Sequence, residues 1–128
     1  MEYKLEIYQK PLEAISSGQK KVEIRTNNSY ESIAYDTLSP GDIINFQMIA
    51  GPPFIGLDVI KPDALKVKVL NIRHYAEPRS LLISEGLEVL STLVENLDNG
   101  VELLYSFHEY KKMIPMHGLF AIEIEPMS

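Results

Sequence analysis

The chain has 128 residues, and its 12 Lys and Arg against 18 Asp and Glu give a net charge of −6. This balance argues against a protein that coats nucleic acid with a broad basic surface, but it allows a local basic groove. The lack of cysteine excludes a cysteine zinc site, and the three histidines lack the spacing of a zinc-binding helix, so we expect neither a metal nor another cofactor. No apolar run reaches the ~20 residues of a membrane helix, and the N-terminus lacks a signal-peptide pattern. We therefore expect one cytoplasmic domain over residues 1–128, with no membrane partner.

The N-terminal region is predicted to form a strand, a helix and a second strand. Apolar and charged side chains alternate over 2–8, which is typical of a half-buried strand. Pro11 suits the first helical position of a short helix over 10–17, and Gly18 suits the residue after its end. The second strand is expected over 20–26.

The second strand carries charges that could form a binding site. Strand alternation puts its apolar side chains on one face and its charges on the other. The alternating charges are Lys21, Glu23 and Arg25. Lys20 has the opposite parity, so it can join them only from the turn that precedes the strand. A solvated strand face with a weak ion pair is the alternative explanation of the same pattern.

The middle of the chain is predicted to form two strands separated by a long loop. A proline-glycine turn leads into a strand over 42–48. Three prolines and two glycines then make regular structure improbable over 50–63. The next strand changes its apolar phase at Leu70, which indicates a bulge, and it ends at His74 and Tyr75.

The C-terminal region is predicted to be helical until a closing strand. A helix over 78–85 is followed by leucines and valines at helical spacing over 87–97. We expect this run to lie in the core, and the alternative is that it forms the surface of a homodimer. One further helix, capped by Asp98 or Asn99, precedes a strand over 120–124.

The order of these elements predicts an α+β fold. Three of the four connections between strands contain too little helix for a parallel crossover, which favours a mixed or antiparallel sheet. We expect a small curled barrel with helices at one end.

Four segments of the chain carry a pattern that a known family shares. They are 18–25, which reads G-x-K-x-x-E-x-R; 40–46, which contains G-D-x-I-x-F; 66–75, which ends in V-x-x-I-x-x-Y; and 118–124. In this order and spacing, the chain resembles the activating signal cointegrator homology (ASCH) domains, whose fold is a PUA-like β-barrel. The resemblance implies a protein that binds RNA or a nucleotide-like ligand in a cleft beside the first segment.

The resemblance implies that the cleft lies at the barrel mouth. Arg25 offers a fork of donors suited to phosphate, and Lys20 offers a mobile point charge. At the strand end, His74 could donate a hydrogen bond and Tyr75 could stack on a base, although packing at the rim would also explain Tyr75. The expected ligand-binding residues are Lys20, Lys21, Glu23, Arg25, His74 and Tyr75.

Two other functions stay open. A bacterial branch of the family hydrolyses acetylcytidine with a lysine, a threonine and a glutamate. The lysine falls on Lys20, but Glu23 stands in place of the threonine, so the hydroxyl is absent; Glu85 or Glu88 could supply the glutamate. If the chain is such an amidohydrolase or a ribonuclease, the expected catalytic residues are Lys20 and Glu23. The third reading is a non-catalytic protein-interaction domain, which would act through the proline-rich loop or an exposed helix face.

Overall fold

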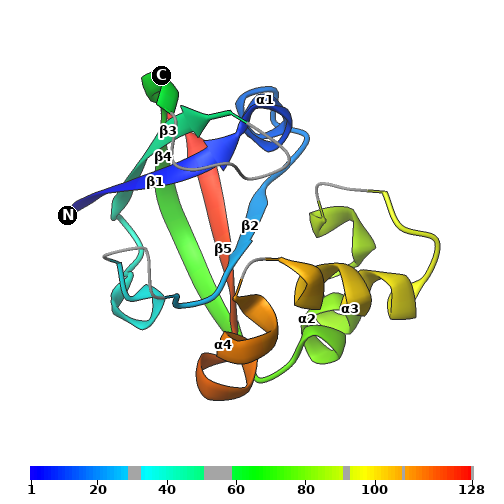
Figure 1. The fold of residues 1–128 in the computed structure, drawn as a ribbon. Coiled ribbons are helices and arrows are strands. Elements are labelled where there is room, and N and C mark those ends of the chain that lie inside the picture. The colour runs from blue at the N-terminus through cyan, green and yellow to red at the C-terminus, as the bar shows by residue number, and fades with distance from the viewer. Residues whose placement is uncertain (29–32, 51–58, 91–92, 108, 128) are drawn as a thin grey trace.

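The computed structural model describes residues 1–28, 33–50, 59–90, 93–107 and 109–127. In these ranges a curved sheet carries helices at both of its ends (Figure 1). The elements in chain order are β1 (Glu2–Tyr8), α1 (Gln9–Ser16), β2 (Val22–Arg25), the 3-10 turn η1 (Tyr35–Thr37), β3 (Ile43–Ile49), β4 (Val59–Tyr75), α2 (Pro78–Glu85), the 3-10 turn η2 (Leu87–Val89), α3 (Leu97–Ser106), α4 (Tyr110–His117) and β5 (Leu119–Pro126). None of the helices in the described ranges is long and apolar enough to cross a membrane.

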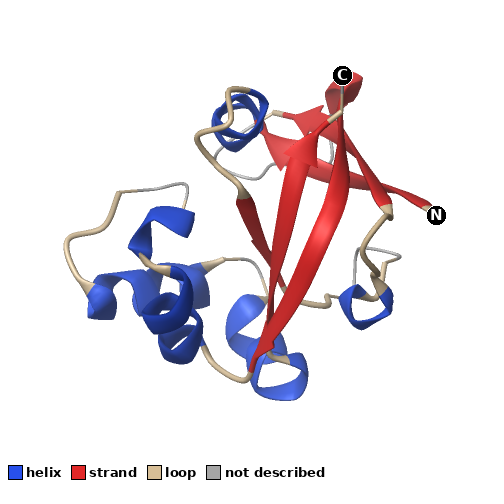
Figure 2. Ribbon diagram, turned by 180° about the vertical axis from the view of Figure 1, so that it is seen from behind, coloured by secondary structure: helices blue, strands red, loops and turns tan. Residues whose placement is uncertain are grey.

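The five strands form one mixed sheet in the order β1-β3-β4-β5-β2. β1 runs parallel to β3, and the other three pairs are antiparallel. The sheet curls into a half-barrel, with α1 at one end and α2, α3 and α4 at the other (Figures 1 and 2). The predicted α+β fold with a PUA-like, mixed barrel is therefore confirmed. β1 and β2 are the two edges of the sheet, so the barrel has a seam between them.

The inner core fills the concave face of the sheet, beneath α1. Each fully buried aliphatic or aromatic side chain here contributes roughly 1.5–3 kcal/mol to folding. β2 is the exception among the strands, because its inward side chains are the charged Glu23 and Arg25, which lie opposite Ile122 and Phe120 of β5. The buried residues of the inner core are Leu5, Ile7, Leu12, Ile15, Ile33, Tyr35, Leu38, Ile44, Phe46, Val67, Val69, Phe120, Ile122 and Ile124.

The outer core lies on the other face of β2 and β5, under the three C-terminal helices. Ile24 and Ala121 face each other across the β2–β5 ladder and contribute to it. Gly100 of α3 lets this helix approach α2 closely, because a Cβ there would lie 2.8 Å from Leu82 Cδ1. The buried residues of the outer core are Ile24, Leu81, Leu82, Val89, Leu104, Tyr110, Ile114, Leu119 and Ala121.

β4 is longer than the sequence predicts. Residues 51–58 of the predicted loop lie outside the described residues, but residues 59–63 belong to β4 and pair with β3, so the prediction was wrong there. Register shifts in this part of the ladder accommodate Pro62, which has no N–H to donate. The bulge predicted near Leu70 is confirmed by the register shift between Val69 and Asn71.

The described residues of the leucine run over 87–97 do not form the predicted helix. Its first residues form the short turn η2, and Leu93 is 99% exposed, so the run is not uniformly core. The next helix begins at Leu97, and its cap is Asn96, whose Oδ1 accepts a hydrogen bond from the Asn99 N–H. The predicted caps at Asp98 and Asn99 were therefore wrong. Apolar spacing overestimated the helix because tertiary packing, rather than periodicity, supplies most helical stability.

Candidate ligand-binding site

The turn after α1 delivers Lys20 to the inner side of the barrel. Gly18 adopts φ +84°, a conformation that L side chains rarely take, and its N–H donates to Ile15 O at 3.1 Å. The Lys20 N–H then donates to Ala14 O at 2.9 Å. Lys20 thus lies in the turn before β2, which is the position that it needs to reach the inward charges of the strand.

Lys20, Glu23 and Arg25 form a buried network, which we call the Glu23 cluster. Glu23 Oε2 accepts hydrogen bonds from Arg25 Nη2 at 2.8 Å and from Nε at 3.0 Å. Glu23 Oε1 lies 3.5 Å from Lys20 Nζ. The three side chains are only 6%, 9% and 14% exposed in the order Lys20, Glu23, Arg25. The solvated strand face that was the alternative explanation does not occur.

The two cations of the Glu23 cluster also bind backbone carbonyls of distant elements. Lys20 Nζ donates to Val89 O of η2 at 2.7 Å. Arg25 Nη2 donates to Glu6 O of β1 at 2.9 Å. Because β1 and β2 are the sheet edges, the contact between Arg25 and Glu6 crosses the seam of the barrel. The cluster therefore joins β2 to one strand and one turn that it does not pair with.

The charge of Glu23 follows from its neighbours. Burial alone would raise the pKa of Glu23, but the charges of Arg25 and Lys20 and their hydrogen bonds lower it by more, so the pKa lies below its usual 4.5. Glu23 is therefore a carboxylate at neutral pH. A carboxylate with a lowered pKa is a weak general base, which bears on the catalytic role predicted for it.

The other three predicted site residues lie in different places. The Lys21 side chain is exposed, and its backbone oxygen accepts from the Ile124 N–H at 3.0 Å. His74 lies on the inner face of β4, whereas Tyr75 lies on the outer face, because neighbouring strand residues point in opposite directions. The Tyr75 hydroxyl contacts Glu85 of α2. Tyr75 is thus separated from the Glu23 cluster by the sheet.

Arg73 and Glu85 form an ion pair on the outer face that the sequence analysis missed. Arg73 donates to both carboxylate oxygens of Glu85, at 2.6 and 2.8 Å, and to Glu123 Oε1 at 2.8 Å. The hydrogen bonds from Arg73 lower the pKa of Glu85, and they outweigh the effect of burial, which raises it. These contacts attach α2 to β4 and β5. Glu85, which could have supplied the glutamate of a hydrolase, is thus held in an ion pair with Arg73.

An open pocket of about 540 Å³, which we call the rim pocket, lies at the end of the barrel beside Phe120. The ladder register places Arg25, Phe120 and His74 in one row across three adjacent strands, on the inner face. His74 therefore lies at this pocket, and the Glu23 cluster lies on the other side of Phe120. The pocket is lined by Asn27, Tyr35, Asp36, Leu38, Ile72, His74, Met116, His117 and Phe120.

Asn27 connects the polar groups of the rim pocket. Its Oδ1 accepts from the Tyr35 N–H at 2.7 Å, and this bond fixes Nδ2 as the donor side of the amide. Nδ2 donates to Asp36 Oδ1 at 3.1 Å and lies 3.5 Å from His117 Nδ1. In neutral His117, Nδ1 is then the acceptor and Nε2 carries the proton. Sequence patterns alone do not single out Asn27 as a site residue.

His74 is held at the edge of the rim pocket by close packing. Its Nε2 lies 2.8 Å from the carbonyl oxygen of His117, which can only accept, so Nε2 donates and Nδ1 is the acceptor in the neutral ring. The ring also packs on Phe120, with centroids 4.9 Å apart. Gly118 permits this arrangement, because a Cβ there would lie 2.5 Å from His74 Nε2.

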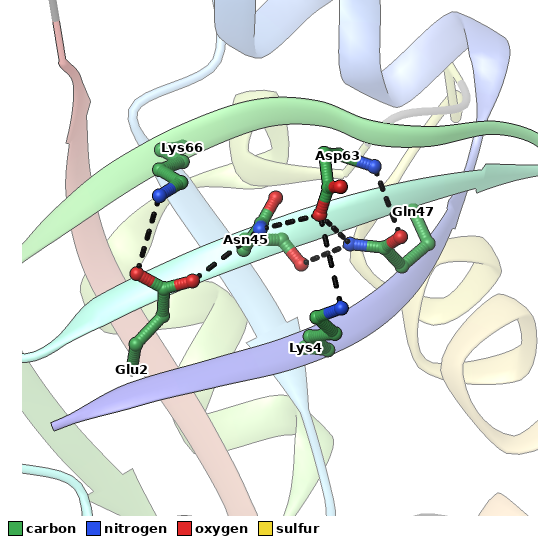
Figure 3. Close-up of polar contacts among 6 residues, drawn as sticks. All are labelled: Glu2, Lys4, Asn45, Gln47, Asp63 and Lys66. Atoms are coloured by element: carbon green, nitrogen blue, oxygen red, sulfur yellow. Dashed lines mark hydrogen bonds and ion pairs between the residues drawn. The ribbon is translucent and has the colours of Figure 1, made fainter.

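A second polar network lies on the outer face of β1, β3 and β4 (Figure 3). Asn45 Nδ2 donates to Asp63 Oδ1 at 2.7 Å, and the Asp63 N–H donates to Gln47 Oε1 at 2.9 Å. Lys66 and Lys4 provide counter-charges for Glu2 and Asp63, at 3.3 and 3.9 Å. These contacts hold the first part of β4 on β3. Most of its polar groups are paired with one another, and Asn45 Oδ1 is the exception among the described residues, so we assign the network a structural role.

Comparisons with known proteins identify similar sequences and folds. The ASCH domain family model matches residues 5–128. The crystal structure of the hypothetical protein PH0355 is 30% identical over 99% of this chain and 100% of that chain, with a TM-score of 0.75. The solution NMR structure of protein PF0455 from Pyrococcus furiosus is 28% identical over 100% of this chain and 99% of that chain, with a TM-score of 0.67. No curated protein matches the chain.

Proposed function

The chain belongs to the ASCH domain family, and from this premise we propose that it binds RNA or a nucleotide-like ligand, with a base seated in the rim pocket. The observation that carries the proposal is the pocket itself. Its volume of about 540 Å³ is within the usual range for small-molecule sites, and the exposed ring of His74, which packs on the buried Phe120, offers a flat surface for stacking.

The Glu23 cluster supports this site rather than forming its surface. Lys20 and Arg25 direct donors at Glu23 and at backbone carbonyls, so these donors hold β2 in place. Arg25 is the neighbour of Phe120 in the ladder, and Asn27 follows two residues later. We therefore assign the cluster the role of positioning one wall of the rim pocket.

Lys112 is a candidate contact for the phosphate of a bound nucleotide, because it lies one helical turn from the pocket lining. Met116 lines the pocket, and Lys112 lies four residues earlier on α4, so both residues share one side of the helix. Lys112 is exposed. Its position extends the site from the base to the backbone of a nucleotide.

The hydrolase and ribonuclease alternatives gain no support from the described contacts. Lys20 Nζ donates to a backbone carbonyl, and the lowered pKa of Glu23 weakens it as a base. The protein-interaction alternative relied partly on the proline-rich loop, whose residues 51–58 lie outside the described residues. The cytoplasmic location and the homodimer stay predictions.

The test is titration with short single-stranded RNAs and with nucleoside monophosphates at several salt concentrations. We expect affinity to fall as salt rises, and Lys112→Gln to reduce the slope of log K against log salt by about 1. Lys68→Gln is the matched control, because it removes an exposed lysine from the outer face of β4. If neither ligand class binds, or if both variants behave alike, the proposed site is wrong.

A further inference from the structure

The polar rim of the pocket presents more acceptors than donors. Asp36 uses Oδ1 to accept from Asn27 Nδ2, while its Oδ2 has no hydrogen-bond partner among the described residues. His74 donates through Nε2 to His117 O, which leaves Nδ1 as an acceptor. Asn27 cannot offer a further donor, because its two N–H groups are directed at Asp36 and His117.

Among the imidazole, amide and carboxylate groups of the rim, the donor that remains for a ligand is the Nε2–H of His117. The contact of His117 Nδ1 with Asn27 Nδ2 puts the proton of the neutral ring on Nε2. A ligand that matches this rim must therefore present two donors toward Asp36 and His74, with an acceptor for His117. It must also be flat, in order to stack on the exposed ring of His74.

We propose that the rim pocket is selective for a guanine base, and this inference rests on the proposed function. Guanine presents two adjacent donors, N1–H and the N2 amino group, beside the O6 acceptor. One donor can bond to Oδ2 of Asp36 in a charge-assisted pair, while the other bonds to Nδ1 of His74. Adenine places the N1 lone pair where guanine has N1–H, so its edge would meet the Asp36 carboxylate with repulsion.

The other bases match the rim less well. Cytosine offers one amino donor with two acceptors, and uracil offers one imino donor between two acceptors, so neither presents two adjacent donors. A pair of hydrogen bonds of this kind discriminates by about tenfold or more between bases. The expected order therefore has guanine first, with the other three bases weaker by about tenfold.

The experiment compares GMP, IMP, AMP, CMP and UMP by isothermal titration against the wild-type protein. IMP keeps N1–H and O6 but lacks the N2 amino group, so it tests the second donor without any change to the protein. We expect GMP to bind about tenfold more tightly than AMP, and IMP to lie between them. Single-stranded RNAs with one or no guanine show whether the same preference holds for a base within a chain.

Asp36→Asn should abolish most of the preference for GMP over AMP, because an amide replaces one acceptor by a donor. Asp98→Asn is the matched control, since Asp98 pairs with Arg79 on the surface of α3. Equal binding of all five nucleotides, or a preference that survives Asp36→Asn, would overturn the guanine assignment alone. If no nucleotide or RNA binds, the proposed function falls together with it.

Discussion

At the scale of single residues, Glu23 supplies the negative charge that offsets the cations inside the barrel. It lies between Lys20 and Arg25 on a face that is otherwise apolar, and its carboxylate compensates two buried cations. A buried ion pair contributes little beyond a well-packed apolar pair, but breaking it leaves an uncompensated buried charge. Glu23 is therefore a residue whose protonation state matters for folding.

The lowered pKa of Glu23 predicts acid sensitivity of a definite sign. Its contribution to stability is fully present above the unfolded pKa of about 4.5 and is lost as pH falls through the lower folded pKa. We expect the wild-type free energy of unfolding to fall more steeply on this acid side than that of Glu23→Gln. Urea unfolding between pH 6 and about pH 3 measures both slopes.

Glu13→Gln is the control for this experiment, because it removes an exposed carboxylate whose partner is Gln9 on the same helix. Its slope should match the wild type. If the slope of Glu23→Gln also matches the wild type, the pKa of Glu23 does not differ between the folded and unfolded states.

At the scale of elements, the C-terminal helices are held by a few buried side chains and not by their full apolar pattern. α3 buries Leu104 in the outer core and packs against α2 and α4, and Gly100 brings it close to α2. The preceding segment turns at Gly86, where φ is +93°, and η2 follows at Leu87–Val89. Leucine content alone therefore does not reveal which residues stabilise this part.

Truncation of two leucines should separate these roles. Leu104 is 1% exposed, so Leu104→Ala should cost about 2–5 kcal/mol of unfolding free energy. Leu93 is 99% exposed, so Leu93→Ala should change it by no more than about 0.5 kcal/mol. Chemical denaturation of both variants measures the difference. A large cost at Leu93 would mean that it is covered in solution, as the homodimer prediction requires.

At the scale of the whole molecule, the half-barrel depends on how its seam is joined. β1 and β2 are not paired with each other in the sheet, and the guanidinium of Arg25 bonds across them to Glu6 O. The same guanidinium binds Glu23, so one side chain connects the inner charges with the opposite edge. A lysine cannot make these bonds together, because it lacks the planar fork.

Arg25→Lys should therefore loosen the seam. We expect a loss of about 1.5–3 kcal/mol of unfolding free energy, as for hydrogen bonds to charged groups, and faster amide exchange in β1 and β2 than in β4 and β5. Hydrogen exchange followed by NMR measures the difference. Arg79→Lys is the control, because Arg79 pairs with Asp98 at the surface. Uniform acceleration across all strands would contradict a local role at the seam.

Local patterns were sufficient for much of the fold. Strand alternation predicted β1, β3 and β5, because the side-chain period of a strand is two and one face is buried. Gly18 and Pro78 marked helix boundaries through their backbone preferences. The four ordered motifs indicated the family, and Lys20, Glu23 and Arg25 do lie together.

By itself, then, the sequence determined β1, β3 and β5, the α+β class and the charges that meet at the start of β2. Only the tertiary structure decided that these charges are buried, that His74 and Tyr75 lie on opposite faces, and that a pocket forms beside Phe120. The reason is distance along the chain: Asn27 and His117 are 90 residues apart, and Lys20 and Val89 are 69 apart. Local periodicity contains no information about such pairs, because strand order and barrel closure alone bring them together.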